Sequence, residues 1–178
     1  MRRFTMVFGL IATSTLAAGC ASLFHKTAPV AQATVANASG ANLGVLNFTP
    51  TSSGVHITGE LKSLTAGQHG IHIHTVGKCE APGFTTAGAH FNPASAKHGL
   101  QNSAGPHAGD MENITVGADG EVDVDLTTPR ITLDAAANTG VFDADGAAIV
   151  VHAAADDQKT DPSGNSGARI ACGIIRKL

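Results

Sequence analysis

Three histidines lie close together in the stretch QHGIHIHTVGKCE (68–80), at His69, His72 and His74. Alternate side chains of a β-strand point to the same face, so His72 and His74 would project together, about 7 Å apart along the backbone, while the isoleucines beside them face the core. Two imidazoles on one face can hold one transition-metal ion. Such a pair also occurs on half-buried strands that bind nothing, so by itself it leaves both interpretations open.

The following segment, AGAHFNPASAKHGLQNSAGPHAGD (87–110), supplies His90, His98, His107 and Asp110 without helical or strand periodicity. Zinc prefers four nitrogen, sulfur or oxygen ligands in a tetrahedron. Three histidines and one aspartate fill that tetrahedron and leave no open position for water. The segment therefore predicts a zinc ion that orders a long loop.

A further histidine, His152, ends the apolar run AIVVHAAADD (148–157) and could complete an imidazole set with His72 and His74. Imidazole suits both copper and zinc, so the spacing leaves open which metal binds where and whether one ion or two are held. A hydrolytic zinc enzyme is one alternative. Asp110 argues against it, because this carboxylate would occupy the position that the attacking water needs.

The elements that must position these residues are short strands. The chain has 21 Gly, 7 Pro, no Trp and no Tyr, with Val- and Ile-containing runs between turn residues. This pattern predicts one all-β domain, a sandwich or barrel of eight antiparallel strands. The strands are expected at 29–37, 44–49, 54–61, 68–76, 147–152 and 169–175, with two more in a hairpin over 113–126.

Alternation within two of these runs predicts which side chains are buried. In GVHITGEL (54–61), Val55, Ile57 and Leu61 share the core face and His56 faces solvent. The hairpin is expected to turn at Asp119-Gly120. Two connections, 77–110 and 153–168, are long and patternless, which is typical of functional loops.

The N-terminus predicts export. Arg2 and Arg3 precede an apolar stretch too short for a membrane span, so residues 1–19 are expected to be a signal peptide. The stretch ends in LAAGC, which resembles the lipobox of bacterial lipoproteins and predicts acylation of Cys20. The alternative is ordinary cleavage nearby, which would leave a free thiol. Residues 20–29 would form a tether, and residues 30–178 the folded domain.

The charge of the mature chain argues against nucleic acid as a partner. Removing residues 1–19 takes away two of the 11 basic residues and none of the 14 acidic ones, which leaves a net charge of −5. A nucleic-acid-binding domain of this size usually carries a basic surface.

The motifs HGIHIH, AGAHFNP, KHG, HAGD, VVHAAADD and GNSGARIACG resemble, in order, those of the Cu/Zn superoxide dismutases. The resemblance extends over about residues 30–178, and GKCEAPGFTTAGAHFNP is similar to the exported bacterial branch. It implies an eight-stranded Greek-key, immunoglobulin-like sandwich that dismutes superoxide to oxygen and hydrogen peroxide by copper redox cycling, with a structural zinc. The alternative is a copper or zinc carrier or storage module on the same fold.

The resemblance also implies a role for each motif residue. Copper would be bound by His72, His74, His90 and His152, and zinc by His90, His98, His107 and Asp110. His90 would bridge both ions and donate a proton. Asp156 would join ligands of the two metals through hydrogen bonds, Arg169 would guide the anion beside copper, and Cys79 and Cys172 would form a disulfide.

The remaining implications concern the surroundings of this centre. His69 would be structural, tying loops together by hydrogen bonds. Lys159 and Ser163 lie in the loop that would form the rest of the substrate channel, and this loop lacks the glutamate-lysine cluster of the eukaryotic enzymes. The resemblance places the chain in the bacterial periplasm or cell envelope, held at a membrane by its lipid anchor, and leaves open whether it is a monomer or a homodimer.

Overall fold

The computed structural model describes Met1 and residues 27–178, which form ten β-strands and one short 3-10 helix. The predicted signal peptide, Cys20 and the first part of the tether lie outside the described residues. Within the described part, no helix is long and apolar enough to cross a membrane. The elements are β1 (Ala31–Asn37), β2 (Asn42–Thr51), β3 (Gly54–Leu61), β4 (Gly67–His69), β5 (Ile71–His74), η1 (Thr85–Ala87), β6 (Ile114–Val116), β7 (Val122–Thr128), β8 (Ala148–His152), β9 (Arg169–Ile174) and β10 (Arg176–Lys177).

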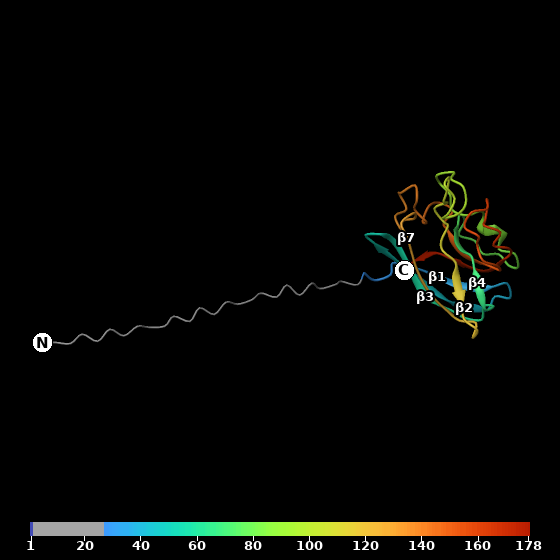
Figure 1. Cartoon of the computed structure of the whole chain (residues 1–178), viewed down its shortest axis with the longest axis horizontal. Coiled ribbons are helices and arrows are strands. Elements are labelled where there is room, and N and C mark those ends of the chain that lie inside the picture. Colours follow the sequence, from blue (N-terminus) through green and yellow to red (C-terminus); the bar gives the residue numbers. More distant parts are fainter. Residues whose placement is uncertain (2–26) are drawn as a thin grey trace.

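The strands form one large antiparallel sheet and one small one (Figure 1). The large sheet has the order β5-β8-β9-β1-β2-β3-β7, with β10 paired to β1, and β4 and β6 form a separate two-stranded sheet. Strands distant in the sequence are therefore neighbours, as a Greek-key connectivity requires. The predicted all-β, antiparallel sandwich or barrel is confirmed.

One expected strand, residues 68–76, is divided in two at Gly70. The Gly70 N–H donates to Ala154 O at 2.9 Å, and a Cβ at this glycine would lie 3.0 Å from the Ser166 Cβ and 3.1 Å from the His72 ring. Because glycine has no Cβ, the backbone at Gly70 can lie close to the 153–168 loop where the chain passes from the small sheet to the large one.

The hairpin predicted over 113–126 is wrong as a pair of hydrogen-bonded strands. Its turn exists, since Gly120 N donates to Gly117 O at 3.0 Å and Gly120 has a φ of +81°. However, β6 pairs with β4, and β7 forms a seven-residue ladder with β3. Alternation predicts the two strands, and the turn predicts that the chain reverses. Neither shows that β7 will pair with the distant strand β3 and not with β6.

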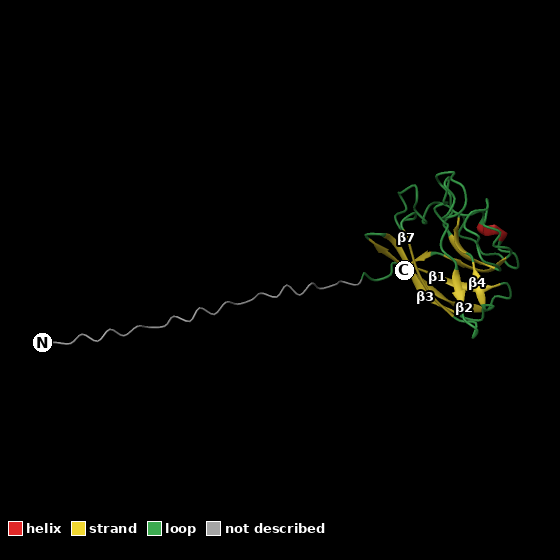
Figure 2. Ribbon diagram, in the orientation of Figure 1, coloured by secondary structure: helices red, strands yellow, loops and turns green. Residues whose placement is uncertain are grey.

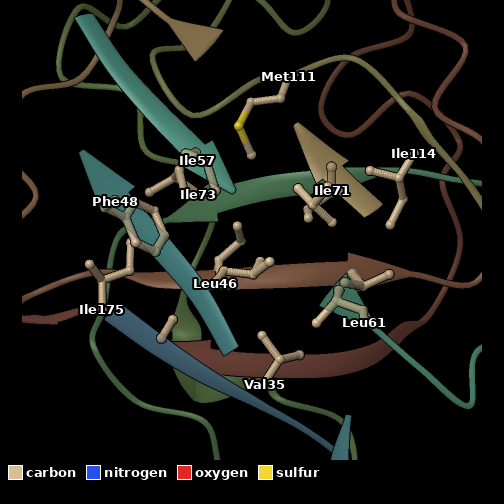
Figure 3. Close-up of a cluster of buried hydrophobic side chains, with 14 of the residues drawn as sticks. Val35, Leu46, Phe48, Ile57, Leu61, Ile71, Ile73, Met111, Ile114 and Ile175 are labelled. Carbon is tan, nitrogen blue, oxygen red and sulfur yellow. The ribbon is translucent and has the colours of Figure 1, made fainter. Parts of the chain in front are cut away.

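The core lies between the facing strands and follows the predicted alternation (Figure 3). Val55, Ile57 and Leu61 are buried, and His56 on the opposite face is partly exposed and pairs with Asp125. Burying each such aliphatic side chain contributes about 1.5–3 kcal/mol. Figure 3 labels ten members of this core: Val35, Leu46, Phe48, Ile57, Leu61, Ile71, Ile73, Met111, Ile114 and Ile175.

Three long connections carry almost no regular structure and gather on one side of the strands (Figure 2). Residues 75–113 join β5 to β6, residues 129–147 join β7 to β8, and residues 153–168 join β8 to β9. The first and last were predicted. No strand was expected between 127 and 146, but this segment was not predicted to be a third long loop.

Candidate metal centre

The strand-borne histidines come from two neighbouring strands. β5 and β8 are antiparallel, with His72 opposite Val150 and His74 opposite Ala148. Both rings lie on the face away from the core, as the alternation predicts. The pairing of β8 with β9 shifts between Val151 and His152, and such a shift redirects a side chain. At this shift the His152 ring lies beside the rings of His72 and His74.

His90 reaches the same place from the 75–113 loop. The backbone of Phe91 donates to Ile73 O at 2.8 Å, and Thr75 N donates to Ala89 O at 3.0 Å, so the loop pairs locally with β5. His74 and His90 are joined by an isolated antiparallel bridge. The His90 ring centre lies 4.0 Å from that of His72 and 4.9 Å from that of His74.

The first candidate metal group is built from four buried imidazoles. One nitrogen of each ring lies within 4.8 Å of the others, and each of these nitrogens lacks a hydrogen-bond partner within the described part of the chain. Orphaned buried polar atoms are costly, so four that converge on one point fit a bound cation. The atoms are His72 Nδ1, His74 Nε2, His90 Nε2 and His152 Nε2.

In three of these rings, an oxygen acceptor beside the second nitrogen fixes the ring proton on that nitrogen. His74 Nδ1 donates to Gly88 O at 2.9 Å, and His152 Nδ1 donates to Gly167 O at 3.3 Å. His72 Nε2 donates to Asp156 Oδ2 at 2.7 Å. Since carbonyl and carboxylate oxygens only accept, the converging nitrogen of each neutral ring carries a lone pair, as a metal ligand must.

The second candidate group surrounds one carboxylate oxygen. Asp110 Oδ1 lies 2.9 Å from His90 Nδ1, 3.0 Å from His98 Nδ1 and 3.2 Å from His107 Nδ1. Zinc bonds of about 2.0 Å in a tetrahedron would separate ligand atoms by about 3.3 Å. All four residues are buried, so the predicted closed, three-histidine and one-aspartate composition fits zinc.

Asp156 joins the two groups. Its Oδ2 accepts from His72 Nε2 at 2.7 Å and its Oδ1 from His98 Nε2 at 3.0 Å. The backbone of Asp156 is fixed by Asn113, whose side chain accepts from Asp156 N and donates to Asp156 O, each at 2.8 Å. Asn113 lies in no motif, and sequence reasoning missed it.

Burial and neighbouring charges shift the pKa values of histidines in the two groups in opposite directions. Burial lowers the pKa of His72 to about 4 and that of His152 to about 3, and it also holds the pKa of His74 well below its usual value. These rings are therefore neutral near pH 7. Burial also disfavours a charged His98, but Asp110 and Asp156 outweigh it and raise the pKa of His98 to about 9.

Arg169 lies next to the first group. Its guanidinium donates to Phe84 O at 2.7 Å and to Gly88 O at 2.6 Å, the same carbonyl that accepts from His74. It lines a hollow of about 400 Å³ with small residues that include Gly83 and Thr85. Hence a positively charged side chain lines a surface hollow and shares the Gly88 carbonyl with His74, although no histidine of the first group lines that hollow.

Lys159 and Ser163 do not line this hollow. Lys159 is exposed, and its carbonyl accepts from Asn102. The carbonyl of Ser163 accepts from the backbone N–H and the hydroxyl of Ser166. Both residues shape the 153–168 loop through their backbone.

The predicted disulfide is present between Cys79 and Cys172, 93 positions apart. It fastens the 75–113 loop to β9, where Cys172 packs with Phe84, Ala148 and Val150 in a small second apolar cluster. Closing a chain loop of this length removes up to roughly 4–5 kcal/mol of conformational entropy from the unfolded state.

Two further residues support the centre from outside it. His69 is buried, with Nδ1 bonded to His152 O at 2.7 Å and Nε2 to Thr65 O at 2.9 Å, so the predicted structural role is confirmed. Arg130, from the 129–147 loop, donates to Asp110 O at 2.6 Å. Sequence reasoning missed Arg130, and no motif or spacing marked it.

Comparison with known proteins agrees with this geometry. The family described as copper/zinc superoxide dismutase (SODC) matches residues 42–175. Cu-Zn superoxide dismutase 1 of Aquifex aeolicus is 42% identical over 163 residues, covering 88% of this chain and 95% of the relative. The Cu-Zn superoxide dismutase of Caulobacter vibrioides is 42% identical over 148 residues, covering 82% and 85%.

A solved structure of a superoxide dismutase-like protein from Bacillus subtilis matches with a TM-score of 0.77 and 40% identity, over 80% of this chain and 96% of that one. Three observations therefore agree: the sheet topology, the two buried ligand groups that share His90, and sequence similarity over most of the domain. The chain belongs to the copper/zinc superoxide dismutase family.

Proposed function

We propose that the two ligand groups form the catalytic centre of a superoxide dismutase, which converts two superoxide anions and two protons into oxygen and hydrogen peroxide. The observation that carries this proposal is the set of four buried imidazole nitrogens that converge near Arg169 and have no hydrogen-bond partner among residues 27–178. Copper is assigned to His72, His74, His90 and His152. Zinc is assigned to His90, His98, His107 and Asp110.

The two metals supply distinct chemistry when bound: copper exchanges single electrons with superoxide, and zinc holds the loop closed. The protein's own contribution begins with His90, whose Nδ1 faces the zinc group and whose Nε2 faces the copper group. His90 Nε2 can carry one proton to the reduced oxygen species. Asp156 holds the His72 and His98 rings in fixed orientations while that proton moves.

Arg169 overcomes the unfavourable charge of the protein. The mature chain has a net charge of −5 and its substrate is an anion, so their overall interaction is repulsive. A guanidinium held by two carbonyls at this hollow provides a local positive field that attracts and orients superoxide. Focusing of this kind raises association rates about tenfold or more; superoxide dismutase is itself a standard example of the effect.

Metal analysis combined with activity tests the assignment. The parent chain should hold one copper and one zinc, and His90→Ala should lose the shared ligand and with it dismutation. His56→Ala is the matched control, because His56 is a partly exposed histidine that pairs with Asp125 and belongs to neither ligand group. Dismutation that survives removal of copper would contradict the proposal. Rapid exchange of copper with a chelator and no scavenging would instead favour the carrier function.

The location of the enzyme follows in part from its covalent structure. The Cys79–Cys172 disulfide indicates an oxidising compartment outside the cytoplasm. Beyond this, we propose that residues 1–19 direct export into the bacterial periplasm and that an acylated Cys20 holds the enzyme at a membrane. Cys20→Ala should move the protein from the membrane fraction to the soluble fraction. Sedimentation of the parent chain distinguishes a monomer from a homodimer.

A further inference from the structure

The C-terminus lies beside the point where the N-terminal segment enters the domain (Figure 1). β10 pairs with the start of β1, with Lys177 opposite Ala31 and Arg176 opposite Gln32. Leu178 N donates to Val30 O at 3.0 Å. The last three residues are therefore fixed next to the tether that leads back to Cys20.

Four exposed residues lie at this corner of the domain and are called the C-terminal patch here: Val30, Arg176, Lys177 and Leu178. Val30 is 42% exposed and Leu178 is 69% exposed, and they are the only strongly exposed large hydrophobic residues between 27 and 178. Arg176 and Lys177 are exposed and form no ion pair with any described residue, whereas Lys62 is paired with Glu60 and Glu121. The patch thus combines unpaired cations with apolar side chains.

A hollow of about 340 Å³ adjoins the patch and is lined by Gln32, Arg176, Lys177 and Leu178, among others. Lys177 Nζ lies 4.9 Å from the centre of the Phe142 ring, and Lys177 is exposed. Next to the tether, the cations of this patch are not paired with any acidic side chain of residues 27–178, in contrast to Lys62.

We propose that the C-terminal patch rests on an anionic lipid surface to which Cys20 is anchored; this inference rests on the proposed lipid anchoring. Val30 is ten positions after Cys20, so the patch stays within about 36 Å of the anchor. Each cation near an anionic leaflet strengthens attraction about fivefold, and apolar side chains add to it at the interface. The mature chain has a net charge of −5, so an anionic surface repels the chain as a whole and attracts it at this patch.

The test uses a fluorescent reporter, which is simple here because the chain has no Trp and no Tyr. Leu178→Trp places a single tryptophan in the patch. Ala38→Trp places one in the exposed β1–β2 turn, at the other end of β1 and about 20 Å away. The mature chain is coupled through the Cys20 thiol to a maleimide lipid in vesicles whose phosphatidylcholine is brominated, with or without phosphatidylglycerol.

We expect phosphatidylglycerol to increase quenching of the Leu178→Trp reporter and to leave the Ala38→Trp reporter unchanged. Adding Arg176→Gln and Lys177→Gln should remove this increase, as should high salt. Lys62→Gln changes the net charge elsewhere and should have no effect. Metal content checks that each variant is folded. Equal quenching of both reporters, or quenching that survives the double substitution, would overturn the proposal.

This design separates the patch from the anchor. Chemical coupling attaches the lipid whether or not cells acylate Cys20. Acylation in cells is measured separately, by mass spectrometry of the N-terminal peptide from the membrane fraction. An unmodified Cys20 would refute the anchoring alone, and loss of the phosphatidylglycerol effect on coupled protein would refute the patch alone.

Discussion

Replacing Asp156 by Asn should weaken copper binding more than zinc binding. Asp156 Oδ1 accepts from both His98 Nε2 and Gln158 N, whereas Oδ2 accepts from His72 Nε2. The single carbonyl oxygen of Asn is therefore expected at the Oδ1 position, where it satisfies two donors. Its amide NH₂ then faces the N–H of His72, and two donors meet.

The size of the effect follows from the burial of this contact. The side chains of His72 and Asp156 are both 0% exposed, so the orphaned donor cannot turn to water. A buried unsatisfied donor costs about 1–3 kcal/mol, which corresponds to an affinity loss of about 5- to 150-fold. If His72 instead moves its proton to Nδ1, that proton points into the copper group and blocks the ligand directly.

Chelator competition, run separately for copper and zinc, measures both affinities. Asp157→Asn is the matched control, because this exposed neighbour bonds only to its own loop, at Lys159, Thr160 and Asn165. We expect Asp157→Asn to bind both metals like the parent chain. An Asp156→Asn variant with unchanged copper affinity, or with zinc weakened more than copper, would refute the reasoning.

Three further predictions concern residues around the centre. Arg169→Gln should lower kcat/KM about tenfold and flatten its dependence on ionic strength, as followed by pulse radiolysis; an unchanged salt dependence would exclude steering by this residue. Arg130→Met should reduce zinc affinity, since it removes the donor to the Asp110 carbonyl, and competition with a zinc chelator checks this; equal affinity would show that the contact is incidental. Zinc binding at pH 7 should release about one proton, because the pKa of His98 is raised to about 9 without metal and this ring must lose a proton to bind. The release should vanish as the pH rises above that value, and calorimetry in buffers of different ionisation enthalpy measures it; uptake of protons would contradict the assignment.

The sequence predicts those parts of the centre that depend on local periodicity. Alternation along β5 places His72 and His74 on one face and Ile71 and Ile73 in the core, and the structure has this arrangement. The same alternation predicts the buried face of β3. Composition and motif order together predict the fold class, because each of them depends on many residues and tolerates local exceptions.

Contacts between segments distant in the sequence were not predictable in this way. The Arg130 contact with Asp110 depends on a 129–147 loop that folds back over the zinc group. The expected hairpin failed for the same reason, since the partner of β7 is β3, more than sixty residues away. Periodicity reports which face of a segment is buried. It carries no information on which of several antiparallel neighbours will provide the hydrogen bonds.

The division of labour between strands and loops explains why patternless segments can control the centre. β5 and β8 carry the rings of His72, His74 and His152, but the oxygens that fix the protons of these rings belong to Gly88, Gly167 and Asp156 in the loops. The strands therefore set the positions of the rings, and the loops set which nitrogen is free. A change that loosens either loop acts on metal binding through these acceptors, even when every ligand is intact. The Cys79–Cys172 disulfide restrains one of the two loops directly, so its effect on stability and its effect on the centre have the same structural origin.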